Sequence, residues 1–196
     1  TGPWAEQLAA LAGIGSVRLA LARGLMIAFE GRPVSTVINR CRPPGDGDIL
    51  VPTGGVCVLG TTDRPTRDPD QETVDQGEVE TLLEQGQMLV PSLRQTSVLR
   101  AWTGVRPLFD ETGASETGTS ETGSPEAGAR TLTRTHALLD HGRRDGVHGF
   151  ITITGGKLTT FRLMAEETVG AVCAQLGDAR TCTTATHPLP APCRSA

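Results

Sequence analysis

The sequence lacks several features that would assign it to a common class of protein. It has no apolar run of about 18 residues, which a membrane-spanning helix needs, and no charged-then-apolar leader at its start. None of its five cysteines are spaced as C-x-x-C, so no zinc or iron–sulfur site is expected. An odd number of cysteines argues against a disulfide framework and favours a reducing, cytoplasmic setting.

The G-x-G-x-x-G fingerprint of dinucleotide-binding domains is also missing. A formal charge of −4 makes a nucleic-acid partner unexpected. A length of 196 residues suits one domain or parts of two, and a hydrophobic fraction of 37% is enough for a core. Because the chain begins Thr1-Gly2-Pro3-Trp4 and ends in a proline-containing stretch, we interpret it as cut from something longer.

Lysine is almost absent, since only Lys157 among the 18 basic residues is a lysine. It follows an apolar run, 150–154, that predicts a buried strand, and it precedes a helical pattern. Between the two lie Gly155 and Gly156, where a backbone can approach a bound anion or ring. A compact ammonium also differs from a guanidinium near a reacting centre. The alternative is a solvated lysine at a helix start.

Hydrophobic periodicity predicts the order of the elements. Helices are expected over 5–12, 76–89 and 158–176, and strands within 17–60 (as an antiparallel meander with a turn at 53–55), 98–109, 131–139 and 150–154. Residues 63–75 read as a loop and 140–149 as a charged turn. Pro107 forbids a central ladder position, so its strand should end or bend there, and such a bend can bring the backbone to a ligand; the alternative is a plain edge-strand terminus. The Glu-Thr-Gly repeats of 111–128 predict a disordered surface insertion with no catalytic role.

Several stretches together resemble the FAD-dependent glycerol-3-phosphate dehydrogenases. They are Val37–Arg40, Asp48–Pro52, Leu59–Thr62, Gly104–Leu108, Leu138–His141, Arg144–Gly146 and Gly149–Glu166. Residues 182–185 are similar to the A subunit of the anaerobic, quinone-linked enzymes. The resemblance implies a mixed α/β fold, in which a discontinuous FAD-binding domain of the amine and hydroxy-acid oxidase type carries an inserted antiparallel substrate domain. Its segments would be 1–15 and 104–178 for the FAD domain, 16–103 for the substrate domain and 179–196 for a tail.

The same resemblance implies a reaction. It is the oxidation of sn-glycerol 3-phosphate to dihydroxyacetone phosphate by hydride transfer to FAD. Electrons would pass to quinone through partner subunits of a larger complex, which would also attach this cytoplasmic chain peripherally to the membrane. Two alternatives stay open: a related flavin amine or hydroxy-acid oxidase, and a non-catalytic fragment that lacks the dinucleotide fingerprint.

The resemblance also implies roles for single residues. Arg106 and Arg134 correspond to arginines that face the phosphate and the flavin edge, where a guanidinium can hold phosphate oxygens bidentately. Arg134 could instead be a surface residue. Lys157 would stabilise negative charge beside the flavin, and with Arg106 it is a candidate catalytic residue. Candidate FAD-binding residues are Thr1, Gly2, Gly104, Gly155, Gly156, Lys157, Leu158 and Thr159; Thr160 and Arg162 are further candidates.

The base that takes the hydroxyl proton is not identified. His141 has the right chemistry. Because it lies beside a charged turn, we interpret it as a surface histidine, and the base as a residue outside this sequence.

Overall fold

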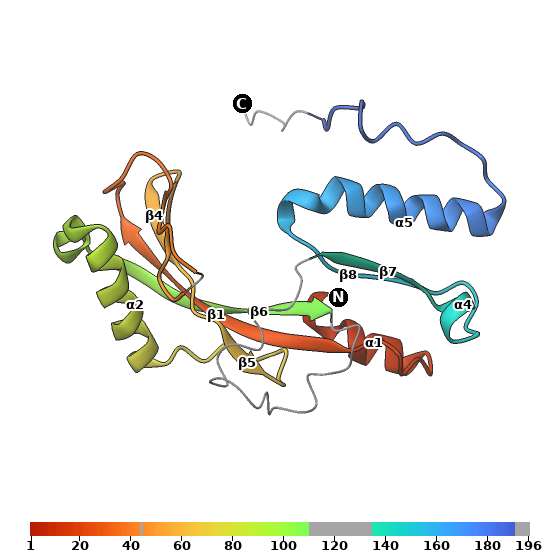
Figure 1. The fold of residues 1–196 in the computed structure, drawn as a ribbon, viewed down its shortest axis with the longest axis horizontal. Coiled ribbons are helices and arrows are strands. Elements are labelled where there is room, and N and C mark those ends of the chain that lie inside the picture. The colour runs from red at the N-terminus through yellow and green to blue at the C-terminus, as the bar shows by residue number, and fades with distance from the viewer. Residues whose placement is uncertain (44, 110–134, 191–196) are drawn as a thin grey trace, which may run out of the picture. The chain divides into compact units, whose positions relative to one another are not determined.

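The computed structural model describes residues 1–43, 45–109 and 135–190 (Figure 1). The chain forms two compact units. Unit 1 comprises Thr1–Trp4 and Arg18–Leu132, and unit 2 comprises Ala5–Val17 and Thr133–Ala196. The predicted insertion at 111–128 and the candidate Arg134 lie outside the described residues.

Unit 1 is built on an antiparallel six-stranded sheet whose longest strands are β1 (Leu19–Glu30) and β6 (Val98–Phe109). The other strands are β2 (Ile38–Asn39), β3 (Ile49–Thr53), β4 (Val56–Gly60) and β5 (Arg64–Thr66). Their order is β2-β3-β4-β1-β5, and β6 pairs with the other edge of β1. This confirms the predicted antiparallel pairing and the turn between β3 and β4. Strands β2, β3 and β4 follow one another as a meander, but β1 pairs with β4 and not with its sequence neighbour β2, so the predicted meander does not include β1. The predicted loop at 63–75 contains the short strand β5, which is too brief to show a hydrophobic period.

One face of this sheet carries the core. Alternation along β1 buries Leu25, Ile27 and Phe29 on the side covered by α2 (Gln76–Leu89), whose bounds match the prediction. The side chain of Asp75 accepts a hydrogen bond from the amide of Glu78 at 2.9 Å and so begins the helix. The helix ends before the 3₁₀ turn Pro91–Gln95. The remaining core residues are Leu50, Cys57, Leu59, Val79, Leu82 and Leu93.

Strand β6 does not end at Pro107, contrary to one of the two expectations for this residue. Its pairing with β1 continues without a register shift from Trp102 through Pro107 to Phe109. The alternative of an edge-strand terminus is wrong for the same reason, because β6 continues for two residues beyond Pro107. Strand β6 does lie at an edge, since β1 is its only partner strand among the described residues, and an edge strand is where proline is tolerated.

Unit 2 contains a two-stranded antiparallel sheet of β7 (His136–Asp140) and β8 (Ile151–Gly155). Its helices are α1 (Ala5–Leu11), the single turn α4 (His141–Arg144) and α5 (Phe161–Leu176), and α5 follows the 3₁₀ turn Leu158–Thr160. The predicted charged turn at 140–149 therefore includes a helical turn. As predicted, α5 ends at Gly177, which has a φ of 71°. Helix α5 packs on β7 and β8, yet none of its residues is buried.

The predicted segments 1–15, 16–103, 104–178 and 179–196 stay a prediction, because compact units reflect contacts within this chain and do not define the domains of the family. The compact units divide the chain after Trp4 and after Val17. The pairing of β6 with β1 runs without interruption across 103/104.

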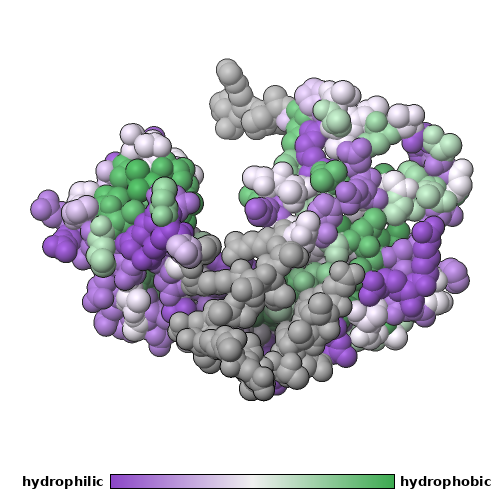
Figure 2. Space-filling view, viewed as in Figure 1, coloured by the Kyte–Doolittle hydropathy of each residue, from purple (hydrophilic) through white to green (hydrophobic). Residues whose placement is uncertain are grey.

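Part of the hydrophobic surface of unit 1 faces solvent. Figure 2 shows green, apolar residues in the region of β4 and α2, where Val37 and Met88 are exposed. In the ranges the structure describes, no helix combines the length and apolar character that a membrane crossing requires.

Candidate functional site

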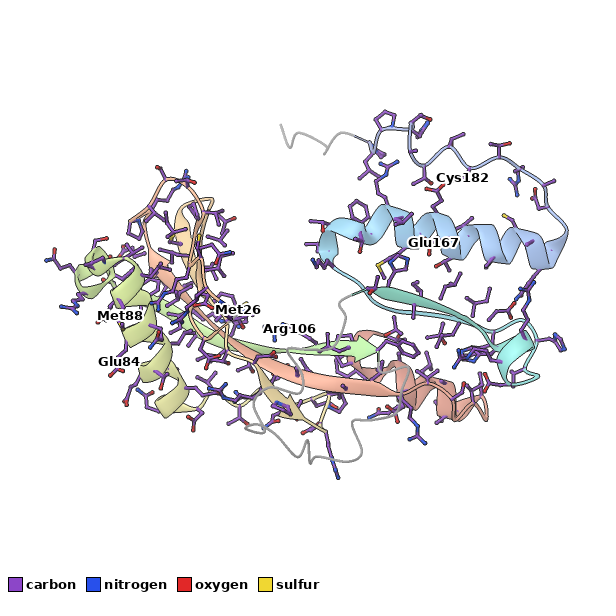
Figure 3. The ribbon with its side chains drawn as sticks, viewed as in Figure 1. Met26, Glu84, Met88, Arg106, Glu167 and Cys182 are labelled. Atoms are coloured by element: carbon purple, nitrogen blue, oxygen red, sulfur yellow. The ribbon has the colours of Figure 1, made fainter. Side chains whose placement is uncertain are left out.

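The candidate site of unit 1 lies on the sheet face opposite α2. Three cross-strand pairs follow one another there: Ala22 with Arg106, Gly24 with Gly104, and Met26 with Trp102. Because side chains alternate along a strand, these residues point away from the core residues Leu25 and Ile27. We call Gly24, Met26, Trp102, Gly104 and Arg106 the glycine face, and Figure 3 shows Met26 and Arg106 projecting from the same side of β1 and β6.

The guanidinium of Arg106 is held across strand β1. Its Nη1 donates to Oδ1 of Asp63 at 3.1 Å, and its Nη2 donates to the hydroxyl of Thr61 at 2.8 Å. Asp63 is only 5% exposed, so the ion pair is shielded from solvent on one side. A Cβ at Gly24 would overlap Nη2 of Arg106, so a side chain there would displace the guanidinium from this position. The sheet therefore fixes where this positive charge lies.

The backbone beside Arg106 is open. Gly104 is exposed, and no atom of the described residues lies within 4 Å of the position its Cβ would occupy. On the next pair along the strands, Trp102 and Met26 bring large side chains to the same face. The guanidinium of Arg100 lies 5.9 Å from the centroid of the Trp102 ring, a distance typical of a cation–π contact.

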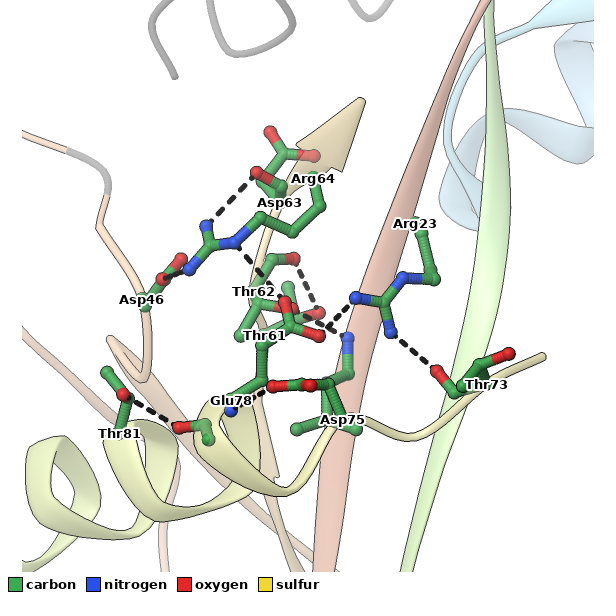
Figure 4. A network of polar contacts seen from close by, with 12 residues as sticks. Arg23, Asp46, Thr61, Thr62, Asp63, Arg64, Thr73, Asp75, Glu78 and Thr81 are labelled. Carbon is green, nitrogen blue, oxygen red and sulfur yellow. Dashed lines mark hydrogen bonds and ion pairs between the residues drawn. The ribbon is translucent and has the colours of Figure 1, made fainter. Parts of the chain in front are cut away.

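A second polar network lies on the α2 side of the same sheet and has a structural role (Figure 4). Arg23 is 7% exposed, donates to the carbonyl of Thr73 at 2.7 Å and pairs with Glu78. Arg64 contacts the same Glu78 at 3.2 Å and Asp46 at 2.7 Å. These ion pairs join the first turn of α2 to β1 and β5, and they satisfy the charges that the fold buries.

The candidate site of unit 2 is the segment that follows β8. Gly155 and Gly156 have φ values of 72° and 77°, which side-chain-bearing residues rarely adopt. A Cβ at either glycine would approach a neighbouring atom to 2.7 Å. The amide of Lys157 donates to the hydroxyl of Thr160 at 3.1 Å, and that hydroxyl donates to the carbonyl of Lys157 at 2.8 Å. These bonds fix the turn, while Lys157, Leu158 and Thr159 are exposed.

Arg162 makes contacts that account for it without a ligand. Its Nη2 donates to the carbonyl of His187 at 2.6 Å and to that of Thr184. The side chain thus holds the stretch that follows α5.

His141 is not a surface residue, so the sequence-based interpretation is wrong. It is fully buried, with Nδ1 2.6 Å from Oδ2 of Asp145 and Nε2 2.9 Å from the hydroxyl of Thr152. The ring also meets the edge of Phe150 at a centroid distance of 5.5 Å. The hydrogen bond with His141, and then that with Ser16, lowers the pKa of Asp145. The charged turn is therefore anchored from inside by a histidine.

The structure groups the predicted site residues into three sets. Gly104 and Arg106 share strand β6, and 155–159 form one turn in unit 2. Gly2 begins the 3₁₀ turn Gly2–Trp4 of unit 1, which lies against β6, and Thr1 precedes it. No metal-binding group of His, Cys, Asp and Glu side chains is found within the described ranges.

Sequence reasoning missed five residues of the unit 1 site: Gly24, Met26, Thr61, Asp63 and Trp102. Alternation along β6 could have placed Trp102 and Gly104 on the face of Arg106. Nothing in the sequence could pair Asp63 with Arg106, because 43 positions separate them.

Comparison with known proteins locates this fold among flavoproteins. A family model described as DAO, FAD dependent oxidoreductase, matches residues 1–162. The A1 subunit of the anaerobic glycerol-3-phosphate dehydrogenase of Haloferax volcanii is 42% identical over 190 residues, which cover 97% of this chain and 30% of that protein. The corresponding A subunit of the Escherichia coli anaerobic enzyme is 43% identical, with coverages of 96% and 33%. The chain thus spans about a third of the length of the curated relatives it matches.

Solved structures agree on the fold. The glycerol-3-phosphate dehydrogenase of Bacillus halodurans, solved in complex with FAD, superposes with a TM-score of 0.63 at 26% identity, covering 94% of this chain and 33% of that one. The glycine oxidase of Geobacillus kaustophilus superposes with a TM-score of 0.61 at 20% identity, covering 92% and 41%. The second likeness concerns the fold alone.

Proposed function

Because the chain belongs to the FAD-dependent oxidoreductase family, we propose that the polypeptide carrying it oxidises sn-glycerol 3-phosphate to dihydroxyacetone phosphate. The relatives named above as glycerol-3-phosphate dehydrogenases support this substrate. The observation that carries the proposal is Arg106, whose guanidinium is held by Asp63 and Thr61 beside an open stretch of strand. A fixed guanidinium suits the planar, bidentate recognition of a phosphate.

The residues present fit a flavin. The turn from Gly155 to Thr159 offers backbone without side chains next to an exposed lysine, and a segment of this kind can approach a planar ring closely. These residues, with Thr1 and Gly2, would hold FAD. When bound, FAD supplies the acceptor for the hydride that leaves C2 of the substrate.

Side chains of this chain bind the substrate and stabilise charge during the reaction. Arg106 binds the phosphate and so orients the carbon skeleton, while the ammonium of Lys157 opposes negative charge that develops during the reaction. The hydroxyl proton at C2 must go to a base. His141 does not provide it, since its two ring nitrogens already contact Asp145 and Thr152 inside unit 2. We place the base in the part of the protein that this sequence does not include.

The proposal extends to the electron acceptor and the location. We propose that electrons pass to quinone through partner subunits of a larger complex. Those partners would also attach the otherwise cytoplasmic protein peripherally to the membrane. The relatives from Haloferax volcanii and Escherichia coli are each named as one subunit of an anaerobic enzyme, which supports a complex.

The test is anaerobic reduction of the flavin in the complete natural polypeptide that carries this sequence. We expect sn-glycerol 3-phosphate to bleach the flavin band and glycine to leave it unchanged. Lys157→Ala should lower kcat by roughly 100-fold, a loss typical of removing one charge-stabilising group. Arg180→Ala, which removes an exposed cation from the stretch after α5, is the control and should keep wild-type kcat.

One result would overturn the proposed function, and another would overturn only the role of Lys157. Reduction by an amino acid but not by glycerol 3-phosphate would assign the protein to the amine oxidases of this fold. Wild-type kcat in Lys157→Ala would remove that lysine from the site.

A further inference from the structure

A pair of glycines lies in the middle of the two longest strands of the chain. Gly24 in β1 and Gly104 in β6 are direct cross-strand partners, and each strand is 12 residues long. Glycine weakens a strand interior and often marks a place where a ligand comes close to the backbone. Two glycines opposite each other remove every side chain from one step of the sheet face.

The two glycines have different surroundings. The space above Gly24 is taken by Arg106, whose Nη2 would overlap a Cβ there. The space above Gly104 is open among the described residues, and Gly104 is exposed. Gly24 therefore makes room for the guanidinium. Beside it, the backbone at Gly104 carries no side chain, and we call this stretch of backbone the floor.

At the next cross-strand pair, two large side chains limit the glycine face, and we call these two side chains the wall. Met26 and Trp102 face each other across β1 and β6, and each is only partly exposed. A tryptophan ring is large and rigid, and methionine packs readily against aromatic rings. The face thus carries a cation and a floor without side chains next to each other on one cross-strand step, and a bulky apolar wall on the next.

We propose that the glycine face sets the length of the substrate. This rests on the proposed function. The phosphate binds Arg106, the short polyol chain lies on the backbone at Gly104, and the Met26–Trp102 pair stops a longer chain. The guanidinium lies over Gly24, directly across from Gly104, and the Met26–Trp102 pair follows roughly 7 Å further along the strands, which suits a three-carbon chain extending from its phosphate. The inference places the substrate, rather than the flavin, on Gly104.

Gly104 allows a sharp experiment because the fold does not need it to be glycine. Its φ is not positive and a Cβ would meet no described atom, so Gly104→Ala and Gly104→Val should fold and keep their FAD. We expect KM for glycerol 3-phosphate to rise about threefold in the alanine variant and tenfold or more in the valine variant, in line with steric effects in substrate pockets. The constant for competitive inhibition by inorganic phosphate should stay unchanged, because phosphate alone reaches only Arg106.

The matched control is Gly55→Ala in the β3–β4 turn. Gly55 also has no described atom within 4 Å of its Cβ position, and its φ is not positive. It should keep the wild-type KM. Gly24→Ala should behave differently from Gly104→Ala, because displacing Arg106 weakens both glycerol 3-phosphate and inorganic phosphate.

The wall is tested by a gain of function. Trp102→Ala should raise kcat/KM for a four-carbon polyol phosphate relative to glycerol 3-phosphate by about tenfold, the scale of one methylene in a pocket. An unchanged ratio of the two kcat/KM values would contradict the role of Trp102 in limiting the length of the substrate.

The remaining outcomes separate the inference from the proposed function. An unchanged KM in Gly104→Val would refute the floor while leaving the proposed function intact. Loss of FAD from that variant, with the circular dichroism spectrum of the wild type, would assign Gly104 to the flavin and overturn the inference. A wild-type protein that glycerol 3-phosphate does not reduce would refute the proposed function, and with it the ligand assigned to the floor.

Discussion

Helices α2 and α5 have similar lengths, 14 and 16 residues, but they contribute very differently to their units. Helix α2 buries Val79 and Leu82 in a core shared with strands β1, β3 and β4. Helix α5 rests on two strands, and none of its residues is fully buried. Val169 and Leu176 are 58% and 78% exposed. Hydrophobic period specifies that each segment is a helix. How much of its apolar face is buried depends on the sheet that the rest of the chain supplies.

This comparison predicts the largest difference for two phenylalanines. Phe29 is 1% exposed in the unit 1 core, and Phe161 at the start of α5 is 49% exposed. In the 196-residue chain, Phe29→Ala should lower the free energy of unfolding by about 3–5 kcal/mol, because it leaves a cavity. Phe161→Ala should cost less than about 1 kcal/mol. Urea unfolding of both variants measures the difference, and equal losses would show that α5 is buried in solution.

A smaller effect is expected where α2 is tied to the sheet by charge. Glu78 contacts both Arg23 and Arg64, and its side chain is 11% exposed. Glu78→Ala should destabilise unit 1 by roughly 3 kcal/mol, because it leaves the enclosed Arg23 without its carboxylate. Glu84→Ala, on the exposed side of α2, is the matched control and should change stability by less than about 0.5 kcal/mol. A loss below about 1 kcal/mol for Glu78→Ala, measured by urea unfolding, would contradict this explanation.

The smallest effect depends on pH and belongs to unit 2. The pKa of Asp145 is lowered, first by its hydrogen bond with His141. A carboxyl with a lowered pKa stabilises the fold above its ordinary pKa of about 3.9, and this stabilisation is lost as the pH falls through the lowered value. Unit 2 should therefore lose stability below about pH 4.

Asp145→Asn should remove this part of the pH dependence. Urea unfolding followed by far-ultraviolet circular dichroism, to which helix α5 of unit 2 contributes, would measure it between about pH 2 and pH 6. Glu166→Gln on α5 makes the same change of charge and should retain the wild-type slope. A wild-type slope in Asp145→Asn would show that the pair with His141 does not contribute.

Much of the fold was predictable from the sequence because the signals are local. The bounds of α2 followed from its apolar period, and Gly177 marked the end of α5. The antiparallel sheet of unit 1 followed from short apolar runs separated by turn residues. Strand β5 was missed because it has only three residues.

The candidate site was predictable only in part. Gly155, Gly156 and Lys157 are adjacent in sequence, so strand, glycines and helix start identify them together. His141 was misread because its surroundings in sequence are charged, while its surroundings in space are Asp145, Thr152 and Phe150. Burial of a single side chain depends on which strands meet behind it, and no local pattern carries that information.

The sequence by itself determined the order of helices and strands, the turn around Lys157 and the resemblance to flavin enzymes. These depend on backbone preferences and side-chain periods that act over a few residues. Only the tertiary structure decided that Gly24 lies under Arg106, that Asp63 pairs with Arg106 and that no atom of the described residues covers Gly104. Those facts come from strand register and from contacts between residues far apart in the sequence, such as the 43 positions between Asp63 and Arg106, which arise when the sheet assembles.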